Sequence, residues 1–178
     1  MKNNFNVFRF SFTDREKPFL PVEKENILAI VNYFSDKYKE IVLLGASLGG
    51  LSVLLSIDNS LKINKLIFIN PFVYYFKKVA WRFRKILISM LVFYPFVKTI
   101  RENLNFYFKS FKPGLITIPT LLIVASKDEK VSPIHGQTLY NQLRSKQKKL
   151  ILDDNIDHGL NKEIYLKNVT DYIIDWLK

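Results

Sequence analysis

Four short and nearly uninterrupted apolar runs limit what this chain can fold into more than any other feature. They lie at residues 41–44 (IVLL), 66–69 (LIFI), 120–125 (TLLIVA) and 150–152 (LIL). Runs without polar alternation are typical of strands buried on both faces of a parallel sheet. Stretches of helical periodicity separate them. The chain is therefore expected to be an α/β protein with a mostly parallel sheet and helices on both faces.

The connecting stretches carry apolar residues at helical spacing and predict amphipathic helices. They cover residues 23–38, about 51–57, 133–145 and 163–177. Near the start of the chain, residues 6–12 (NVFRFSF) alternate instead, with every second residue a phenylalanine. This period of two predicts one further strand.

One long connection, residues 71–115, breaks this rhythm, because it is far longer than an ordinary link between two strands. It carries 13 of the 26 aromatic residues, and its nine basic residues outnumber a single acidic one, Glu102. It therefore supplies +8 of the formal net charge of +11. We expect one core domain, formed by residues 1–70 and 116–178, with residues 71–115 as an insertion.

Composition excludes several kinds of site. The chain has no cysteine, which excludes disulfides, cysteine-ligated metals and a cysteine nucleophile. It has two histidines, His135 and His158, so a three-histidine zinc site is impossible. Neither a secretory signal nor an apolar stretch of about 18 residues is recognisable. We therefore expect a cytoplasmic protein, with contact to a membrane surface left open.

The segment GASLGG, residues 45–50, follows the first apolar run and opens a helical stretch. G-x-S-x-G between a strand and a helix is the pattern of a nucleophile elbow, a turn so tight that Gly45 and Gly49 must be small. The turn would hold the Ser47 hydroxyl at the carboxyl end of the sheet. The backbone N–H of Leu48 could then point at a developing oxyanion. The alternative is a glycine-rich turn with an incidental serine.

A serine nucleophile needs a base and an orienting carboxylate. His158 lies in a loop after the last strand, at the same sheet edge as Ser47, whereas His135 lies early in an expected helix. Asp128 follows the third strand at that edge, which gives the chain order Ser, Asp, His. We favour His158 as base and Asp128 as acid. The alternative acids are Glu129, Asp153, Asp154 and Asp157.

Nearly the whole chain resembles the α/β-hydrolase superfamily, and within it the monoacylglycerol-lipase and serine-aminopeptidase-like esterases. GASLGG resembles the elbow, ASKDEKVSP the acid loop around Asp128, and DHGL the histidine loop around His158. The resemblance implies a serine hydrolase that cleaves carboxylic esters with an apolar acyl or lipid-like group and needs no metal or cofactor. In such proteins an insertion at the place of residues 71–115 is commonly a cap over the active site.

The chain departs from that family at its start. Family members have several strands before the one that residues 6–12 resemble, and a loop after one of them supplies a second oxyanion N–H. Nothing here matches that loop, and FTDREKP stands where the family often has a glycine-rich loop. We therefore expect the chain to lack the opening strands. An exposed sheet edge would then favour a homo-oligomer. The alternative function is a weakly active or inactive homologue that binds a membrane or a partner through the insertion.

Aromatic and basic side chains interleave in the insertion. This pattern is typical of a helical lid with a solvated basic face, or of a surface that contacts anionic lipid. Base stacking on nucleic acid is a third interpretation, and we disfavour it because no nucleic-acid-binding motif accompanies the charge. The aromatic candidates for substrate or membrane contact are Trp81, Phe83, Phe93, Tyr94 and Phe96.

Overall fold

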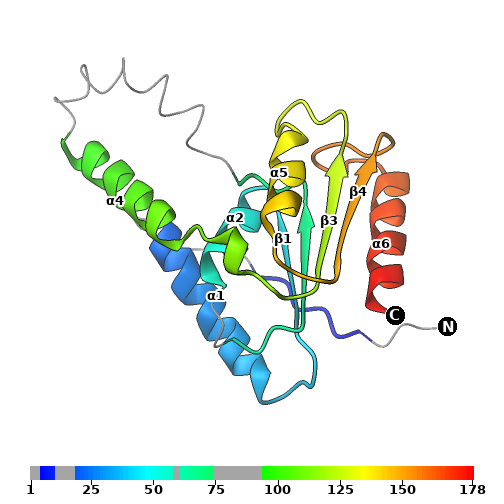
Figure 1. Ribbon diagram of the computed structural model, residues 1–178, viewed down its shortest axis with the longest axis horizontal. Coiled ribbons are helices and arrows are strands. Elements are labelled where there is room, and N and C mark those ends of the chain that lie inside the picture. The colour runs from blue at the N-terminus through cyan, green and yellow to red at the C-terminus, as the bar shows by residue number, and fades with distance from the viewer. Residues whose placement is uncertain (1–4, 11–18, 58–60, 74–93) are drawn as a thin grey trace.

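The computed structural model describes residues 5–10, 19–57, 61–73 and 94–178 (Figure 1). Its centre is a four-stranded, all-parallel sheet in the order β1-β2-β3-β4. The strands are β1 (Val42–Ala46), β2 (Lys65–Ile69), β3 (Thr120–Ala125) and β4 (Lys148–Asp153). The four apolar runs thus form the four strands, and the expected α/β class is confirmed.

Five α-helices and one short 3₁₀-helix accompany this sheet in the described part of the chain. The helices are α1 (Phe19–Ser35), α2 (Leu48–Ser56), α4 (Tyr94–Ser110), η2 (Pro113–Leu115), α5 (Ile134–Gln142) and α6 (Glu163–Leu177). Figure 1 shows α1 and α2 on the opposite side of the sheet from α6. Helices therefore cover both faces, as the sequence predicts.

The alternation of side chains along the strands divides the core into two layers. Leu66 and Phe68 of β2 pack with residues of α1, α2 and α5 on one face. Ile67 and Ile69 of the same strand pack against α6 on the other. Because both sets are almost fully buried, β2 shows no polar alternation in its sequence.

The strand expected near the start of the chain is not formed in residues 5–10, which have no regular secondary structure; residues 11 and 12 lie outside the described part. Phe8 instead packs edge-on against Phe34 of α1, with ring centroids 4.9 Å apart. Phe10 packs against the core layer that contains α1. The alternation thus marks a segment with one apolar side, but no described strand pairs with its backbone.

The insertion is described only at residues 71–73 and 94–115. In that part, α4 packs on α1 and α2, and the N–H of Leu20 donates to Oδ1 of Asn103 at 2.9 Å. The Tyr107 hydroxyl donates to the carbonyl of Val73 at 2.9 Å, which joins the two described ends of the insertion. No helix in the described ranges is both long and apolar enough to cross a membrane.

Candidate active site

Ser47 occupies the turn between β1 and α2 with φ 51° and ψ −122°. A non-glycine residue in this region of backbone space is strained and is held there by its surroundings. Its N–H donates to the carbonyl of Ile69 at 2.9 Å, and its own carbonyl accepts from the N–H of Phe72 at 3.0 Å. The end of β2 thus fixes the turn that carries the hydroxyl.

The crowding around this turn differs in part from the expectation. A Cβ added to Gly45 would lie 2.7 Å from the carbonyl oxygen of Gly49, so Gly45 must lack a side chain. A Cβ added to Gly49 would meet no described atom within 4 Å, which corrects the expected tightness there. The close approach is instead at Gly50, where an added Cβ would lie 3.2 Å from Cβ of Pro71. The reason is that Gly50, and not Gly49, lies on the side of α2 next to the chain leaving β2.

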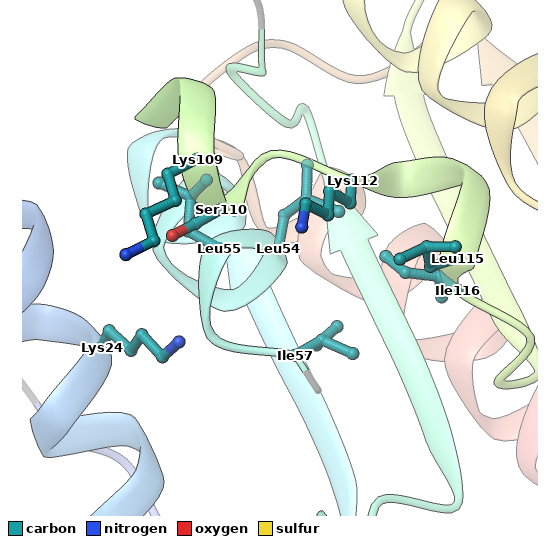
Figure 2. Close-up of a pocket in the computed structure, with 9 residues that line it drawn as sticks. All are labelled: Lys24, Leu54, Leu55, Ile57, Lys109, Ser110, Lys112, Leu115 and Ile116. Atoms are coloured by element: carbon teal, nitrogen blue, oxygen red, sulfur yellow. The ribbon is translucent and has the colours of Figure 1, made fainter. Parts of the chain in front are cut away.

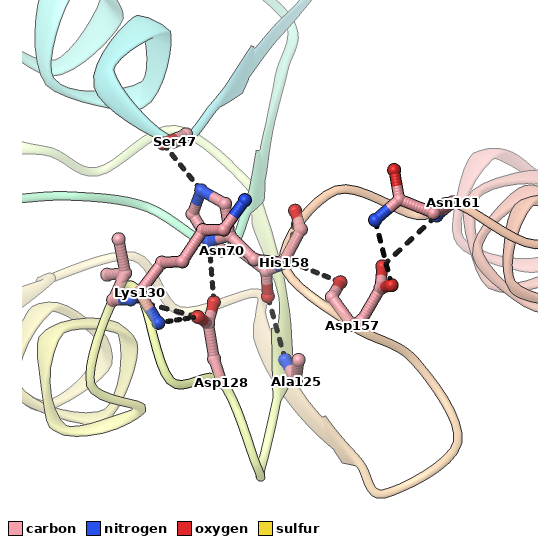
Figure 3. Close-up of polar contacts among 9 residues, drawn as sticks. Ser47, Asn70, Ala125, Asp128, Lys130, Asp157, His158 and Asn161 are labelled. Atoms are coloured by element: carbon pink, nitrogen blue, oxygen red, sulfur yellow. Dashed lines mark hydrogen bonds and ion pairs between the residues drawn. The ribbon is translucent and has the colours of Figure 1, made fainter.

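Three side chains from three loops meet at the carboxyl edge of the sheet (Figure 3). Ser47 Oγ lies 3.0 Å from Nε2 of His158. Nδ1 of His158 lies 2.7 Å from Oδ2 of Asp128. The loops follow β1, β4 and β3, so the parallel sheet brings together residues that are 111 and 30 positions apart in the sequence.

The carboxylate of Asp128 is held on its other side by the backbone. Its Oδ1 accepts hydrogen bonds from the N–H groups of Lys130 and Val131, both at 2.8 Å. The Asp128 side chain is 1% exposed and that of His158 is 17% exposed. A carboxylate can only accept, so the Nδ1 proton of His158 points at Asp128 and Nε2 is left as the acceptor for the Ser47 hydroxyl.

The alternative base, His135, has different neighbours. Its Nδ1 accepts from the N–H of Val73 at 3.3 Å, and its ring stacks on Phe72 with centroids 5.4 Å apart. His158, and not His135, lies within hydrogen-bonding distance of Ser47. His135 supports the chain that leaves β2.

The alternative acids are engaged elsewhere or exposed. Asp153 accepts from the hydroxyl of Tyr172 at 2.9 Å, and burial together with this hydrogen bond raises the pKa of that tyrosine. A hydrogen bond from Ser126 and the charge of Lys127 lower the pKa of Asp154. Glu129 is exposed.

Asp157 directly precedes His158 and bonds to the following turn. Its carboxylate accepts from the backbone and side-chain amides of Asn161 at 3.1 and 3.0 Å. Partial burial raises the pKa of Asp157, but hydrogen bonds from Asn161, Leu160 and Gly159 outweigh it and hold the pKa below its ordinary value. This residue therefore shapes the histidine loop without touching the imidazole.

Leu48 is the first residue of α2 and directly follows Ser47, so its backbone N–H lies at the start of the helix. Within the described ranges it has no hydrogen-bond acceptor, whereas the N–H of Gly50 is bonded to the Ser47 carbonyl at 3.1 Å. The first N–H groups of a helix carry a partial positive charge and suit an anion. The Leu48 N–H is therefore free to act as one oxyanion donor.

Sequence reasoning missed Asn70, the residue directly after β2. It is 2% exposed, has φ 44°, and bonds through its side chain to Ala125 at the end of β3 and to the loop of His158. The signal was an Asn-Pro pair immediately after a buried strand, since asparagine tolerates a positive φ and often ends a strand.

The aromatic candidates of the insertion cannot be located at this site. Trp81, Phe83 and Phe93 lie outside the described residues, and Tyr94 and Phe96 begin α4 without described side chains. The insertion as a cap over the site therefore stays a prediction. In the ranges that the structure describes, no group of three or more metal-ligating side chains occurs.

A hollow of about 330 Å³ lies away from this site, at the far end of α2 (Figure 2). Leu54, Leu55 and Ile57 form part of its apolar wall, and three lysines stand at its rim. The lysines are Lys24, Lys109 and Lys112. Since α2 begins beside Ser47 and this hollow lies at its other end, the hollow does not belong to the site of the triad.

Comparison with solved structures identifies the fold. The chain is similar to MGS-MChE2, an α/β hydrolase enzyme from a lagoon-sediment metagenome, with 16% identity over 88% of this chain and 70% of that one, and a TM-score of 0.59. It is similar to a monoacylglycerol lipase of Paleococcus ferrophilus, with 16% identity over 89% and 74% of the two chains and a TM-score of 0.61.

A third similar structure is the mouse α/β hydrolase domain-containing protein 10, with 19% identity over 89% of this chain and 70% of that one, and a TM-score of 0.63. No protein-family model and no curated protein sequence matches the chain. The structural likenesses show that this chain has the α/β-hydrolase fold.

Proposed function

We propose that this chain is a serine hydrolase that cleaves carboxylic esters through an acyl-enzyme. The proposal is carried by one observation, the continuous hydrogen-bonded series from Ser47 through His158 to Asp128. A serine at positive φ, joined to an imidazole whose other nitrogen meets a buried carboxylate, has the geometry of an activated nucleophile.

In the first half of the reaction, Ser47 Oγ attacks the ester carbonyl carbon while its proton passes to Nε2 of His158. Asp128 keeps the ring in the orientation and tautomer that this transfer requires, and it stabilises the imidazolium. The carbonyl oxygen becomes an oxyanion that the N–H of Leu48 can stabilise. The Nε2 proton then passes to the leaving alkoxide, which departs as an alcohol.

In the second half, water attacks the acyl group on Ser47 and gives its proton to Nε2 of His158. The second tetrahedral intermediate collapses with cleavage of the bond from the acyl carbon to Ser47 Oγ, and the Nε2 proton passes to Oγ. The carboxylic acid leaves and the Ser47 hydroxyl is restored. Apart from the substrate and water, these steps use the triad and the N–H of Leu48 as oxyanion donor. Removing one oxyanion donor costs roughly 10²–10³ in kcat in a known hydrolase. A chain relying on Leu48 alone would therefore be slow.

For the substrate, we propose an ester with an apolar acyl group. The aromatic richness of residues 71–115 supports this choice, as does the structural similarity to a monoacylglycerol lipase. Short and long p-nitrophenyl esters test it, since an apolar acyl site lowers KM as the chain lengthens. Equal kcat/KM from acetate to octanoate would argue against an apolar site.

The catalytic proposal is tested with a fluorophosphonate probe and p-nitrophenyl esters. We expect the probe to label Ser47 and Ser47→Ala to abolish both labelling and hydrolysis. Ser35→Ala is the matched control, because that serine ends α1 and, within the described residues, its hydroxyl bonds only the carbonyl of Asn32. Absence of labelling in the parent chain, or undiminished hydrolysis by Ser47→Ala, would sink the proposal.

The second candidate is a weakly active or inactive homologue that binds an anionic membrane through the insertion. The hollow of Figure 2 favours it, because Lys109 and Lys112 stand beside apolar residues and have no carboxylate partner in the described residues. Co-sedimentation with phosphatidylserine vesicles tests it. Lys109→Glu/Lys112→Glu should release the chain, and the control Lys146→Glu/Lys149→Glu should not.

A further inference from the structure

Asn70 joins the end of β3 to the loop that carries His158. Its N–H donates to the carbonyl of Ile123 at 2.9 Å, which continues the pairing of β2 with β3 by one residue. Its φ of 44° then turns the chain away from the sheet. Two positions on, the N–H of Phe72 reaches the Ser47 carbonyl at 3.0 Å. The turn at Asn70 is therefore part of the support beneath the serine.

The side chain of Asn70 spans the gap between the end of β3 and the histidine loop (Figure 3). Its Oδ1 accepts from the N–H of Ala125 at 2.7 Å, at the end of β3 and three residues before Asp128. Its Nδ2 donates to the carbonyls of Asp157 and His158, both at 3.1 Å. One buried amide thus fixes the backbone of the base relative to the strand that leads to the acid.

This network requires an amide. Oδ1 meets a donor and Nδ2 meets two acceptors, so the orientation of the side chain follows from its partners. A carboxylate of the same shape would keep the bond to Ala125 but would set a second acceptor against the carbonyls of Asp157 and His158. Because Asn70 is 2% exposed, water cannot easily replace the lost donors.

We propose that Asn70 is a positioning residue of the triad, which holds His158 at the distance from Ser47 and Asp128 that proton transfer requires. The inference rests on the proposed function. Asn70 would act through the backbone of His158 and would not itself touch the substrate. A displacement of about 1 Å in a reacting group can cost roughly 10² in rate. Asn70→Asp should therefore lower kcat about 10²-fold and leave KM within about twofold.

The matched control is Asn64→Asp. Asn64 lies just before β2, at the opposite end of the sheet, and its Oδ1 also accepts from a backbone N–H, that of Ile41 at 2.8 Å. A second control, Ile27→Ala on α1, lowers stability through a cavity away from the site. Both should keep kcat within about threefold, since neither touches the histidine loop. If Asn70→Asp does not fold, Asn70→Gly keeps the positive φ and removes the donors without adding charge.

Two measurements separate failure of this inference from failure of the proposed function. The first is kcat and KM for a p-nitrophenyl ester at a temperature where circular dichroism shows every variant folded. The second is the ¹⁵N chemical shifts of the His158 ring, which report the bond to Asp128 without any activity. We expect Asn70→Asp to change the His158 shifts and Asn64→Asp to leave them unchanged.

If the parent chain is active and Asn70→Asp keeps its kcat within about threefold, the inference is overturned. The same holds if the kcat loss equals that of Ile27→Ala. If the parent chain is inactive, the proposed function fails, and the ¹⁵N shifts of the His158 ring alone test whether Asn70 positions His158. Shifts that change in Asn70→Asp support positioning, and shifts that match the parent overturn it.

Discussion

Asp128→Asn should remove nearly all hydrolytic activity without unfolding the chain. The two backbone N–H groups at 2.8 Å would keep the amide oxygen of the variant in the position of Oδ1. The amide nitrogen would then meet Nδ1 of His158, which can only accept from it, so the ring proton moves to Nε2. A protonated Nε2 cannot take the proton of Ser47. A change of this kind costs about 10⁴ in kcat in a serine protease, which is about 5 kcal/mol at the transition state.

Because the Asp128 side chain is 1% exposed, we expect that water cannot replace the missing carboxylate. We therefore expect kcat of Asp128→Asn to fall by roughly 10³- to 10⁴-fold. Initial rates with a p-nitrophenyl ester measure it, and the rate of fluorophosphonate labelling measures the nucleophile directly. Glu129→Gln is the control, since Glu129 is exposed and adjacent. Retention of more than a tenth of kcat by Asp128→Asn, or an equal loss in Glu129→Gln, would refute the reasoning.

The two glycines of the elbow should respond to alanine in opposite ways. Gly45→Ala should destabilise the chain by about 1–3 kcal/mol, because the new Cβ would lie 2.7 Å from the carbonyl oxygen of Gly49. Gly49→Ala should stabilise the chain by about 0.5–1 kcal/mol, because its Cβ would meet no described atom within 4 Å and alanine favours a helix over glycine. Urea unfolding measures both, and equal effects would contradict the geometry. The lowered pKa of Asp157 means that its contribution is present above its unfolded pKa and is lost as pH falls below about 4. Asp157→Asn should therefore lower stability at pH 7 and flatten its decline below pH 4. An unchanged acid limb in unfolding curves from pH 7 to pH 2 would count against this assignment.

Strands β2 and β3 could be predicted because burial on both faces leaves an uninterrupted apolar run. The outer strands β1 and β4 also have apolar runs, although Leu44 and Leu152 are exposed there. Helix α6 was predicted with the bounds that it has, since its apolar stripe packs on a single face. Helix α1 begins at Phe19, four residues earlier than expected. Pro21 lies in its first turn, where a backbone N–H has no helical partner, so the proline does not interrupt the helix. Residues 6–10 were predicted wrongly, since a strand needs a backbone partner that periodicity cannot reveal.

The meeting of Ser47, Asp128 and His158 could be anticipated because parallel strands bring their carboxyl ends to one edge. The geometry of the turn could be anticipated only in part. Gly45 was recognised by its spacing from the serine, while the contact of Gly50 with Pro71 depends on where the chain leaves β2. Asn70 was missed for the same reason, because its partners lie 55, 87 and 88 residues away.

The positive φ of Ser47 sets stability against reactivity in this chain. A residue with a side chain held in such a region costs of order 1–3 kcal/mol, and glycine avoids most of that cost. Ser47→Gly should therefore melt at a higher temperature than Ser47→Ala, and a lower melting temperature would show that the turn is unstrained. A screen that selects variants for thermal tolerance alone would favour losing the hydroxyl. Directed evolution of a more thermostable variant of this protein must therefore measure hydrolytic activity in every round.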